Sequence, residues 1–308
     1  MSDPFAGKTV AVVGFGNQGE AQARLLAHAG TSVLIGARAG GPSEARARAQ
    51  GFRTATPAEA ARQADVLAVL VPDESIPLLW SELTAAASAH TAFVFAHGFA
   101  LMYGALDCSA VGDVVLVSPT GPGSLMAPGR PPVAGYLAVH RDSSGNAWSL
   151  AEAWADGLGI TPRHRTTVRE ETEVDLFGEQ VVLCGGLNAL VTAAFETLVA
   201  RGYSPVIAYL ECVHQLKYLA DLLHARGIAG FREAISRTAL YGDLTRGPRV
   251  VGAASREAMS EILEEVRSGA FAREWTAEVA AGTPRLEAAV REAGGHPIEE
   301  ARRRALET

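Results

Sequence analysis

The densest group of chemically active side chains in this sequence lies between Glu170 and Gln180. The five carboxylates of this segment are Glu170, Glu171, Glu173, Asp175 and Glu179. Asp175 and Glu179 are four residues apart and would share one face of a helix, and Glu211 and Gln215 repeat this spacing. Oxygen ligands on two helices are typical of a site for Mg²⁺ or another hard cation. The alternative is an acidic helix start that water solvates and the helix dipole favours.

A glycine-rich turn near the start of the chain indicates a dinucleotide-binding site. Residues 8–13 predict a strand and residues 20–30 a helix, and the turn between them reads Gly14-Phe15-Gly16-Asn17-Gln18-Gly19. In this context the first glycine permits a tight turn, the second lets the backbone approach a pyrophosphate, and the third lets the helix pack on the strand. The helix N-terminus then faces the phosphates. The alternative is a glycine-rich turn without a ligand.

The residues after the second predicted strand (32–37) indicate which dinucleotide binds. A site that prefers NAD usually carries Asp or Glu here, where the carboxylate binds the ribose 2′-hydroxyl. This chain carries Arg38 instead, followed by Ser43 and Arg46. A guanidinium and a hydroxyl suit a 2′-phosphate, so we expect NADPH. Alternatively, both arginines are ordinary solvated charges.

Four further strand-sized apolar runs follow, with helical segments between or after them, at 66–71, 92–96, 114–117 and 136–140. Near-continuous apolar strands that alternate with helices predict an α/β fold, a doubly wound parallel sheet covered on both faces. Ligands bind beyond the carboxyl ends of such strands. We therefore expect Pro72, His97 and Thr120, which follow three of these runs, to line one cleft.

The second half of the chain has a helical pattern. Apolar residues recur at helical spacing over 175–200, 205–225, 231–240, 256–267 and 271–281. The sequence therefore predicts two domains, an NADP-binding Rossmann domain at 1–165 and an all-helical domain at 166–308 that carries the acidic residues. We expect the charged end of the chain, 301–308, to fray.

Composition narrows the choice of partner and compartment. The net charge of −7 and the pI near 5.7 argue against nucleic acid or an anionic membrane as partner. The longest apolar runs are strand-sized and interrupted by Gly, Pro or charge, and no export-signal pattern is present. Three scattered cysteines do not form a disulfide framework or a zinc site. We expect a reduced cytoplasmic protein that acts on a small molecule.

Several segments together resemble ketol-acid reductoisomerase, the acetohydroxyacid isomeroreductase of branched-chain amino-acid synthesis. They are the glycine turn, VPDE, AHGF, the GPG loop, GIAGFREAIS and, most specifically, ETEVDLFGEQVVLCGGLNALV. The resemblance runs from residue 8 to residue 275, and the length resembles the short form of that family. It implies a Rossmann domain joined to a knotted helical domain that intertwines with a second subunit in a homodimer.

The resemblance also implies roles for single residues. His97 resembles a histidine close to the nicotinamide. Asp175, Glu179 and Glu211 match the family's magnesium-binding carboxylates. Ser236 matches the serine that grips the substrate carboxylate, and the resemblance implies that it reaches the site together with Glu211 from the partner subunit.

Two candidate site residues depart from the family pattern. Thr120 stands where the family has a proton-shuttling lysine, and Gln215 stands where it has a fourth carboxylate. Together the two changes leave the summed charge of the site unchanged. A neutral amide attracts a hard dication far less than a carboxylate does, so magnesium binding should be weakened or lost. The two-metal polarisation that makes an alkyl shift feasible should weaken with it.

These departures lead to three hypotheses about function. The first is an NADPH-dependent reductase that has lost the isomerisation step and reduces an imine or, as second choice, a keto substrate in a specialised pathway. A protonated imine needs no metal, and the three retained carboxylates would stabilise or protonate it. The second is a magnesium-dependent ketol-acid reductoisomerase with an unusual site. The third is a non-catalytic NADPH-binding protein, which the retained acidic residues argue against.

Overall fold

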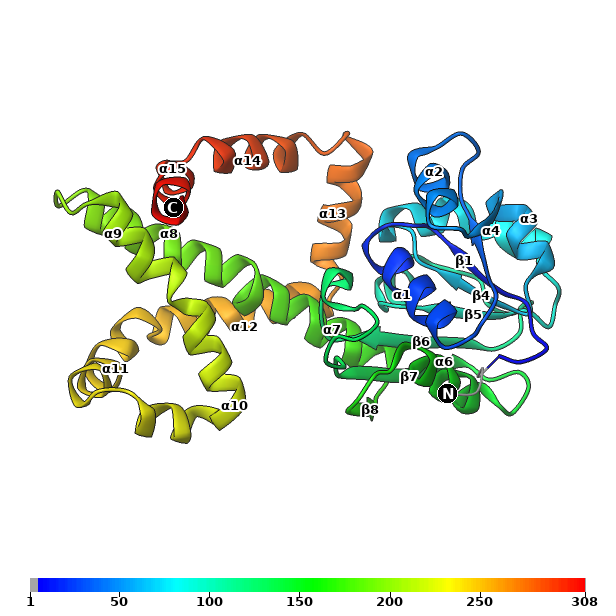
Figure 1. Cartoon of the computed structure of the whole chain (residues 1–308), viewed down its shortest axis with the longest axis horizontal. Coiled ribbons are helices and arrows are strands. Elements are labelled where there is room, and N and C mark those ends of the chain that lie inside the picture. The colour runs from blue at the N-terminus through cyan, green and yellow to red at the C-terminus, as the bar shows by residue number, and fades with distance from the viewer. Residues whose placement is uncertain (1–4, 308) are drawn as a thin grey trace. The chain divides into compact units, whose positions relative to one another are not determined.

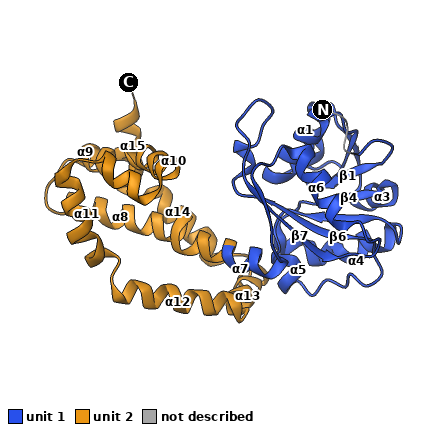
Figure 2. Cartoon of the chain, turned by 90° about the horizontal axis from the view of Figure 1, so that it is seen from below, with its two compact units in different colours: residues 1–174 blue, residues 175–308 orange. Residues whose placement is uncertain are grey.

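The computed structural model describes residues 5–307 of the chain. By their internal contacts the residues form two compact units, Met1–Val174 and Asp175–Thr308 (Figure 2). The division falls inside one helix, α7 (Val168–Gly178). The sequence predicted a domain boundary earlier, between 165 and 166, and that boundary stays a prediction.

Unit 1 is built on an eight-stranded sheet (Figure 1). Its strands are β1 (Val10–Val13), β2 (Val33–Gly36), β3 (Arg53–Ala55), β4 (Val66–Val69), β5 (Ala92–Phe95), β6 (Val114–Pro119), β7 (Gly135–Arg141) and β8 (Arg163–Arg165). Their order across the sheet is β3-β2-β1-β4-β5-β6-β7-β8. Every residue of β1, β2, β4 and β5 is buried, as expected for parallel strands covered on both faces.

Helices cover both faces of this sheet, which confirms the predicted doubly wound Rossmann fold. They are α1 (Asn17–His28), α2 (Pro42–Ala49), α3 (Pro57–Gln63), α4 (Ile76–Ala86), α5 (Phe99–Tyr103) and α6 (Ala147–Leu158). One buried cluster joins the sheet to α1, α2 and α6, and Leu26 and Trp154 belong to it. A second cluster joins the opposite face to α3, α4 and α5, and Trp80 and Leu101 belong to it.

The predicted parallel sheet includes one antiparallel strand, which the sequence analysis did not foresee. β7 pairs antiparallel with β6, whereas every other pair of neighbours is parallel. A parallel neighbour requires a crossover connection, usually a helix. The connection here, residues 120–134, contains four prolines and one short 3₁₀ turn, Gly123–Leu125, so the chain returns alongside the strand it has just left. The edge strands β3 and β8 gave no apolar signal because they are three residues long and rich in arginine.

Unit 2 is entirely helical over its described residues, as the sequence predicted (Figure 1). After α7 its helices are α8 (Gly185–Val199), α9 (Pro205–Tyr209), α10 (Leu216–Ala234), α11 (Arg237–Val250), α12 (Ala253–Arg267), α13 (Ala270–Ala280), α14 (Pro284–Gly295) and α15 (Pro297–Leu306). The predicted continuous segment 231–240 is wrong, because the chain leaves the helix at Ile235 and Ser236 begins α11 as its N-cap. Whether the helical path is knotted stays a prediction.

Two π-helical turns interrupt the helices of unit 2. They span Glu179–Leu183 and Leu210–His214. In the first, the Cys184 amide donates to the Glu179 carbonyl over 2.9 Å, five residues back. A Cβ at Gly185 or Gly186 would collide with the carbonyl oxygens of residues 180 and 181, so the two glycines make this turn possible. Such turns occur frequently at functional sites.

The prediction that the C-terminal segment frays is wrong for its helical part. Ala301 in α15 is 1% exposed and packs in one buried cluster with Phe195, Ala208 and Tyr209. Proline at the start of α15 and a His296 side chain that accepts from the Ile298 amide stabilise the beginning of the helix.

Helix α7, the first π turn and α8 form one helical run, Val168–Val199, that is unusually apolar for its exposure. Its most apolar window has a mean hydropathy of 1.6, and 6% of that window is buried. By length and composition this run can cross a membrane. The prediction that apolar runs are only strand-sized is wrong here, because the glycines that interrupt the run in sequence are accommodated by the π turn.

Candidate functional site

The glycine turn after β1 has the geometry that the sequence predicted. Gly14 has a φ of +99°, and a Cβ there would lie 2.6 Å from the Leu70 carbonyl oxygen. A Cβ at Gly19 would collide with the Gly14 carbonyl oxygen. Only glycine fits at these two positions, because β1, α1 and the end of β4 meet there.

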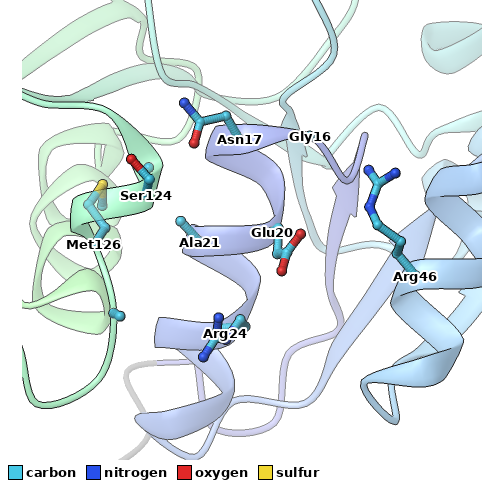
Figure 3. Close-up of a pocket in the computed structure, with 10 residues that line it drawn as sticks. Gly16, Asn17, Glu20, Ala21, Arg24, Arg46, Ser124 and Met126 are labelled. Carbon is cyan, nitrogen blue, oxygen red and sulfur yellow. The ribbon is translucent and has the colours of Figure 1, made fainter. Parts of the chain in front are cut away.

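Gly16 is different, because a Cβ at this position would meet nothing within 4 Å. Gly16 is the N-cap of α1 and has no side chain that caps the helix, so the first amides of the helix face open space. A pocket of about 350 Å³ begins here (Figure 3). Its lining residues are Gly16, Asn17, Glu20, Ala21, Arg24, Arg46, Gly123, Ser124, Met126 and Ala127. The residues present therefore fit a bound pyrophosphate.

The other predicted residues of the glycine turn have separate surroundings. The Phe15 side chain is 1% exposed and packs edge-on against Phe52, so it belongs to the core. Asn17 is exposed at the first position of α1. Gln18 turns its amide to the neighbouring loop, where Nε2 donates to the Gly121 carbonyl over 3.2 Å. Pro72 is exposed just beyond β4.

The loop after β2 and the first turns of α2 hold the candidates for a 2′-phosphate, Arg38 in the loop and Ser43 and Arg46 in the helix. Arg38 is exposed, and the Arg46 guanidinium donates to the Phe15 carbonyl over 2.5 Å and lies 3.4 Å from the Ser43 hydroxyl. The nearby Glu44 carboxylate is already occupied. It accepts from the Gly40 amide and from Arg48, both over 2.7 Å. The Gly40 hydrogen bond is the main cause of the lowered pKa of Glu44.

His97 lies at the end of β5 and is held by a carboxylate to which the sequence analysis assigned no role. Its Nδ1 lies 3.2 Å from Oε1 of Glu171, whose side chain is fully buried. The other carboxylate oxygen accepts from the Gly98 amide over 3.0 Å and from the Thr172 hydroxyl over 3.3 Å. An ionised carboxylate only accepts, so this pairing favours the tautomer with the hydrogen on Nδ1.

Glu171 was visible in the sequence only as one member of an acidic segment. What distinguishes it from Glu170 is burial. Glu171 is 2% exposed, whereas Glu170 is an exposed residue that accepts from the Thr166 hydroxyl. Glu171 and Thr172 are both buried, and Glu171 contacts the segment after β5, 73 residues earlier in the chain, so no local pattern identified it. A Cβ at Gly98 would collide with the Thr172 hydroxyl, so the fit at this contact is tight.

Thr120 follows β6 directly, and its hydroxyl does not reach into open space. The hydroxyl donates to the Ala134 carbonyl over 3.1 Å, and the Thr120 amide donates to the same oxygen over 2.9 Å. The side chain therefore closes the base of the 120–134 connection. A threonine is too short to take the place of a lysine that extends from this point.

The predicted magnesium ligands lie at the two π turns. Asp175 lies in α7, Glu179 opens the first π turn, and Glu211 lies in the second, with Gln215 directly after it. Glu179, Glu211 and Gln215 are exposed, and Asp175 is partly buried. Over residues 5–307, no three His, Cys, Asp or Glu side chains form a metal-binding group. A single chain thus offers oxygen donors of the right kind but does not bring them together.

Ser236 is the N-cap of α11. Its hydroxyl oxygen accepts from the Ala239 amide over 3.2 Å. This capping bond uses the oxygen as an acceptor and leaves the O–H able to donate to a carboxylate. Ser236 therefore has a structural role as an N-cap, and its substrate-binding role stays a prediction.

Comparison with known proteins identifies the family. The family model described as "Acetohydroxy acid isomeroreductase, NADPH-binding domain" matches residues 4–163, and "Ketol-acid reductoisomerase, C-terminal domain" matches residues 168–307. A curated ketol-acid reductoisomerase (NADP(+)) of Saccharopolyspora erythraea is 45% identical over 302 residues, which cover 96% of this chain and 90% of that protein.

Solved structures agree with this assignment. An NADH-preferring ketol-acid reductoisomerase from an uncultured archean is 37% identical, with a TM-score of 0.93 and coverage of 97% of this chain and 95% of the other. A pyrroline-5-carboxylate reductase from Coxiella burnetii shares the fold, with a TM-score of 0.62 at 14% identity and coverage of 85% and 98%.

The main functional prediction, an imine or keto reductase without the isomerisation step, is wrong. It rested on two residues, Thr120 and Gln215, whereas the similarity to curated and solved ketol-acid reductoisomerases extends over 96% and 97% of the chain. The error came from giving two single positions more weight than the rest of the sequence, because a change at one or two side chains does not by itself remove a function that the whole fold carries. The predicted resemblance itself is confirmed, and the chain belongs to the ketol-acid reductoisomerase family.

Proposed function

We propose that this chain is an NADPH-dependent enzyme that rearranges an acetohydroxy acid by a 1,2-alkyl shift and reduces the resulting 3-hydroxy-2-keto acid. The observation that carries this proposal is the 45% identity to a curated ketol-acid reductoisomerase over 302 residues. Both units contribute to it, since the family models match 4–163 and 168–307. The alkyl shift moves one carbon substituent to the neighbouring carbonyl carbon, and the reduction adds one hydride and one proton to the new ketone.

NADPH, when bound, supplies the hydride. The open backbone at Gly16 and the first amides of α1 would hold its pyrophosphate. Arg38, Ser43 and Arg46 would bind the 2′-phosphate. NADPH is favoured over NADH because the carboxylate of Glu44, in the first turn of α2, is paired with Arg48 and accepts from the Gly40 amide, so it is already occupied and does not serve a ribose hydroxyl.

His97 is the proposed proton carrier for the reduction. Because Glu171 holds Nδ1, Nε2 is the nitrogen that would pass a proton to or from a substrate oxygen. The buried Glu171 carboxylate also stabilises the ring when it is protonated. In this proposal His97 moves the proton, and Glu171 fixes the orientation of the His97 ring.

Mg²⁺, when bound, polarises the substrate oxygens and so makes the alkyl shift feasible. Asp175, Glu179 and Glu211 supply carboxylate oxygens, and Gln215 supplies one neutral carbonyl oxygen. Because no metal-binding group forms within residues 5–307 of one chain, the proposal requires a second copy to complete the set. The neutral fourth donor implies weaker magnesium binding than four carboxylates would give.

A homodimer through unit 2 follows from the exposure of its apolar side chains. Leu183, Ile207, Ile228 and Val290 are each more than half exposed, and the helical run 168–199 is 6% buried in its apolar window. A soluble monomer rarely exposes apolar patches of this extent. A second copy is the proposed occupant rather than lipid, because the same run carries Asp175 and Glu179. The free cysteines at 108, 184 and 212 support a reduced, cytoplasmic setting.

The test separates the two chemical steps. The purified full chain is given NADPH and either 2-acetolactate or its rearranged 3-hydroxy-2-keto acid, with Mg²⁺ or with a chelator, and NADPH oxidation and the dihydroxy acid product are followed. The proposal predicts turnover of both substrates with Mg²⁺, and loss of acetolactate turnover with the chelator. Reduction of the rearranged acid without any turnover of acetolactate would contradict it.

A further inference from the structure

A directed chain of hydrogen bonds crosses unit 1 from α6 to the loop after β6. The Trp154 indole Nε1–H donates to Oε1 of Gln22 over 2.9 Å. Nε2 of Gln22 donates to Oε1 of Gln18 over 3.2 Å, and Nε2 of Gln18 donates to the Gly121 carbonyl over 3.2 Å. Trp154 and Gln22 are both 0% exposed. The chain therefore connects the core beneath α1 with a loop at the candidate site.

The indole fixes the direction of this chain. Indole nitrogen only donates, so Gln22 must present its oxygen to Trp154 and its NH₂ group to Gln18. Gln18 then accepts with its own oxygen, and its NH₂ group is left facing the loop. The chain can end only on an acceptor, and the Gly121 carbonyl is that acceptor.

The position of Gln22 argues that this chain has a purpose beyond packing. Gln22 lies on the buried face of α1, among Ala21, Ala23 and Leu26. An apolar residue would fill such a position without the cost of desolvating an amide. Gln18 and Gln22 are four residues apart, so their side chains lie next to each other on one face of α1. Together they link the buried indole of Trp154 to the loop that lies beside the first turn of α1.

The loop that receives this chain is also fixed at two other points. A Cβ at Gly123 would collide with the Asn17 carbonyl oxygen, so the loop lies directly against the start of α1. At its base, both the amide and the hydroxyl of Thr120 bond to Ala134. Gly123 and Ser124 then form one wall of the 350 Å³ pocket, and Gly16 and Asn17 form another (Figure 3).

We infer that Gln22 and Trp154 are positioning residues that act through Gln18 to hold the 120–124 loop at the dinucleotide site. This inference rests on the proposed NADPH site. A loop that is already in place loses less conformational freedom when the cofactor binds, so the chain of hydrogen bonds should raise the affinity for NADPH.

The first test measures the loop without any ligand. Gln22→Met and Gln18→Met keep the approximate length of the side chain and remove the amide, and Trp154→Phe removes the indole donor. We expect faster amide hydrogen exchange in the segment 120–127 of the full chain for each variant. Gln63→Met is the matched control, because Gln63 is an exposed glutamine of α3 whose amide donates to the Glu59 carbonyl of its own helix. Equal exchange in wild type and Gln22→Met would overturn the inference.

The second test measures NADPH binding and separates positioning from general destabilisation. Losing one link should raise the NADPH dissociation constant by about two- to tenfold. The double variant Gln18→Met/Gln22→Met should bind NADPH no more weakly than Gln18→Met alone, because the loss of Gln18 already interrupts the series of hydrogen bonds. Additive effects would mean that Gln22 acts by packing, and would overturn the inference. If Trp154→Phe does not fold, the comparison of the Gln18 and Gln22 single variants with the double variant is sufficient to test the inference.

The outcomes distinguish this inference from the proposed function. A wild-type chain that binds no NADPH contradicts both the proposed dinucleotide site and the inference that rests on it. A wild-type chain that binds NADPH and turns over acetolactate, with variants unchanged in exchange and in affinity, contradicts only the positioning role. Faster exchange together with the non-additive loss of affinity supports it.

Discussion

At the scale of single residues, burial separates two neighbouring glutamates that the sequence presents as equals. Glu171 is enclosed and bonded on both oxygens, whereas Glu170 faces water. A buried carboxylate is costly unless its oxygens are bonded, so its partners are held as firmly as it is. The orientation of the His97 ring therefore depends on Glu171.

The first prediction concerns Glu171→Gln. The amide keeps the shape of the side chain but loses the charge that stabilises a protonated His97, so kcat should fall about tenfold or more. Steady-state rates with acetolactate measure this, and circular dichroism checks that the chain remains folded. Glu170→Gln is the matched control and should retain wild-type rates, since that side chain is exposed. An unchanged kcat for Glu171→Gln would remove the carboxylate from the mechanism.

The second prediction concerns Gln215→Glu. A carboxylate in place of the amide adds charge to the proposed metal site, so the Mg²⁺ concentration for half-maximal activity should fall, by about tenfold. The measurement is a magnesium titration of acetolactate turnover. Gln63→Glu adds the same charge on α3 and should leave the titration unchanged. A magnesium dependence that does not respond to Gln215→Glu would place this residue outside the metal site.

At the scale of elements, the turn from β1 into α1 uses glycines for two different reasons. Gly19 has no room for a side chain because α1 packs on the turn, whereas Gly16 has room that a ligand would fill. Gly19 serves the fold, and Gly16 is proposed to serve the cofactor. Substitution by alanine therefore separates the two roles.

The third prediction compares Gly16→Ala with Gly19→Ala. Gly16→Ala should cost about 1 kcal/mol of stability or less, as for a weaker N-cap, and should strongly reduce NADPH affinity because the methyl group occupies the phosphate position. Gly19→Ala should destabilise the fold itself, by about 1–3 kcal/mol, because its Cβ collides with the Gly14 carbonyl. Denaturant unfolding and NADPH titration measure the two effects. Equal stability losses would contradict this division of roles.

The elements that could be predicted are those specified by local sequence. The four-residue apolar strands and the glycine turn were located because burial and close approach demand particular residues there. The sequence analysis missed the direction of β7 and the short polar strands β3 and β8, because pairing with strands elsewhere in the sequence determines them. It also missed the π turns, because they depend on the register of hydrogen bonds within a helix. The contact between His97 and Glu171 spans 74 residues, and no local pattern encodes it.

At the scale of the whole molecule, the apolar exposure of unit 2 sets it apart from unit 1. Unit 1 buries most of its large apolar side chains against the sheet, in two clusters, with Leu78 among the exceptions. Unit 2 leaves many of its own in contact with solvent, Leu190 and Val290 among them. The stability of unit 2 should therefore depend on a second copy.

The fourth prediction concerns Leu190→Glu in α8. A charge buried in a dimer interface without a partner is strongly unfavourable, so this variant should dissociate to monomers and lose magnesium-dependent turnover. Light scattering after size-exclusion chromatography gives the oligomeric state. Leu78→Glu is the matched control, since Leu78 is 81% exposed in unit 1, and it should remain a dimer. A Leu190→Glu variant that stays dimeric would exclude this part of α8 from the interface.

The π turn after Glu179 has a consequence for the register of the helical run in which it lies. A π turn inserts one extra residue, which corresponds to a rotation of about 100° around the helix axis. The side chains after Cys184 therefore point in different directions, relative to Asp175, from those they would have in a regular α-helix. The acidic face before the turn and the apolar face after it are therefore offset by a defined angle. Removing one residue between 180 and 183 would restore an uninterrupted α-helix. The apolar face of α8 would then rotate relative to Asp175 and Glu179, and the proposed dimer could no longer bury this face and complete the metal site at the same time.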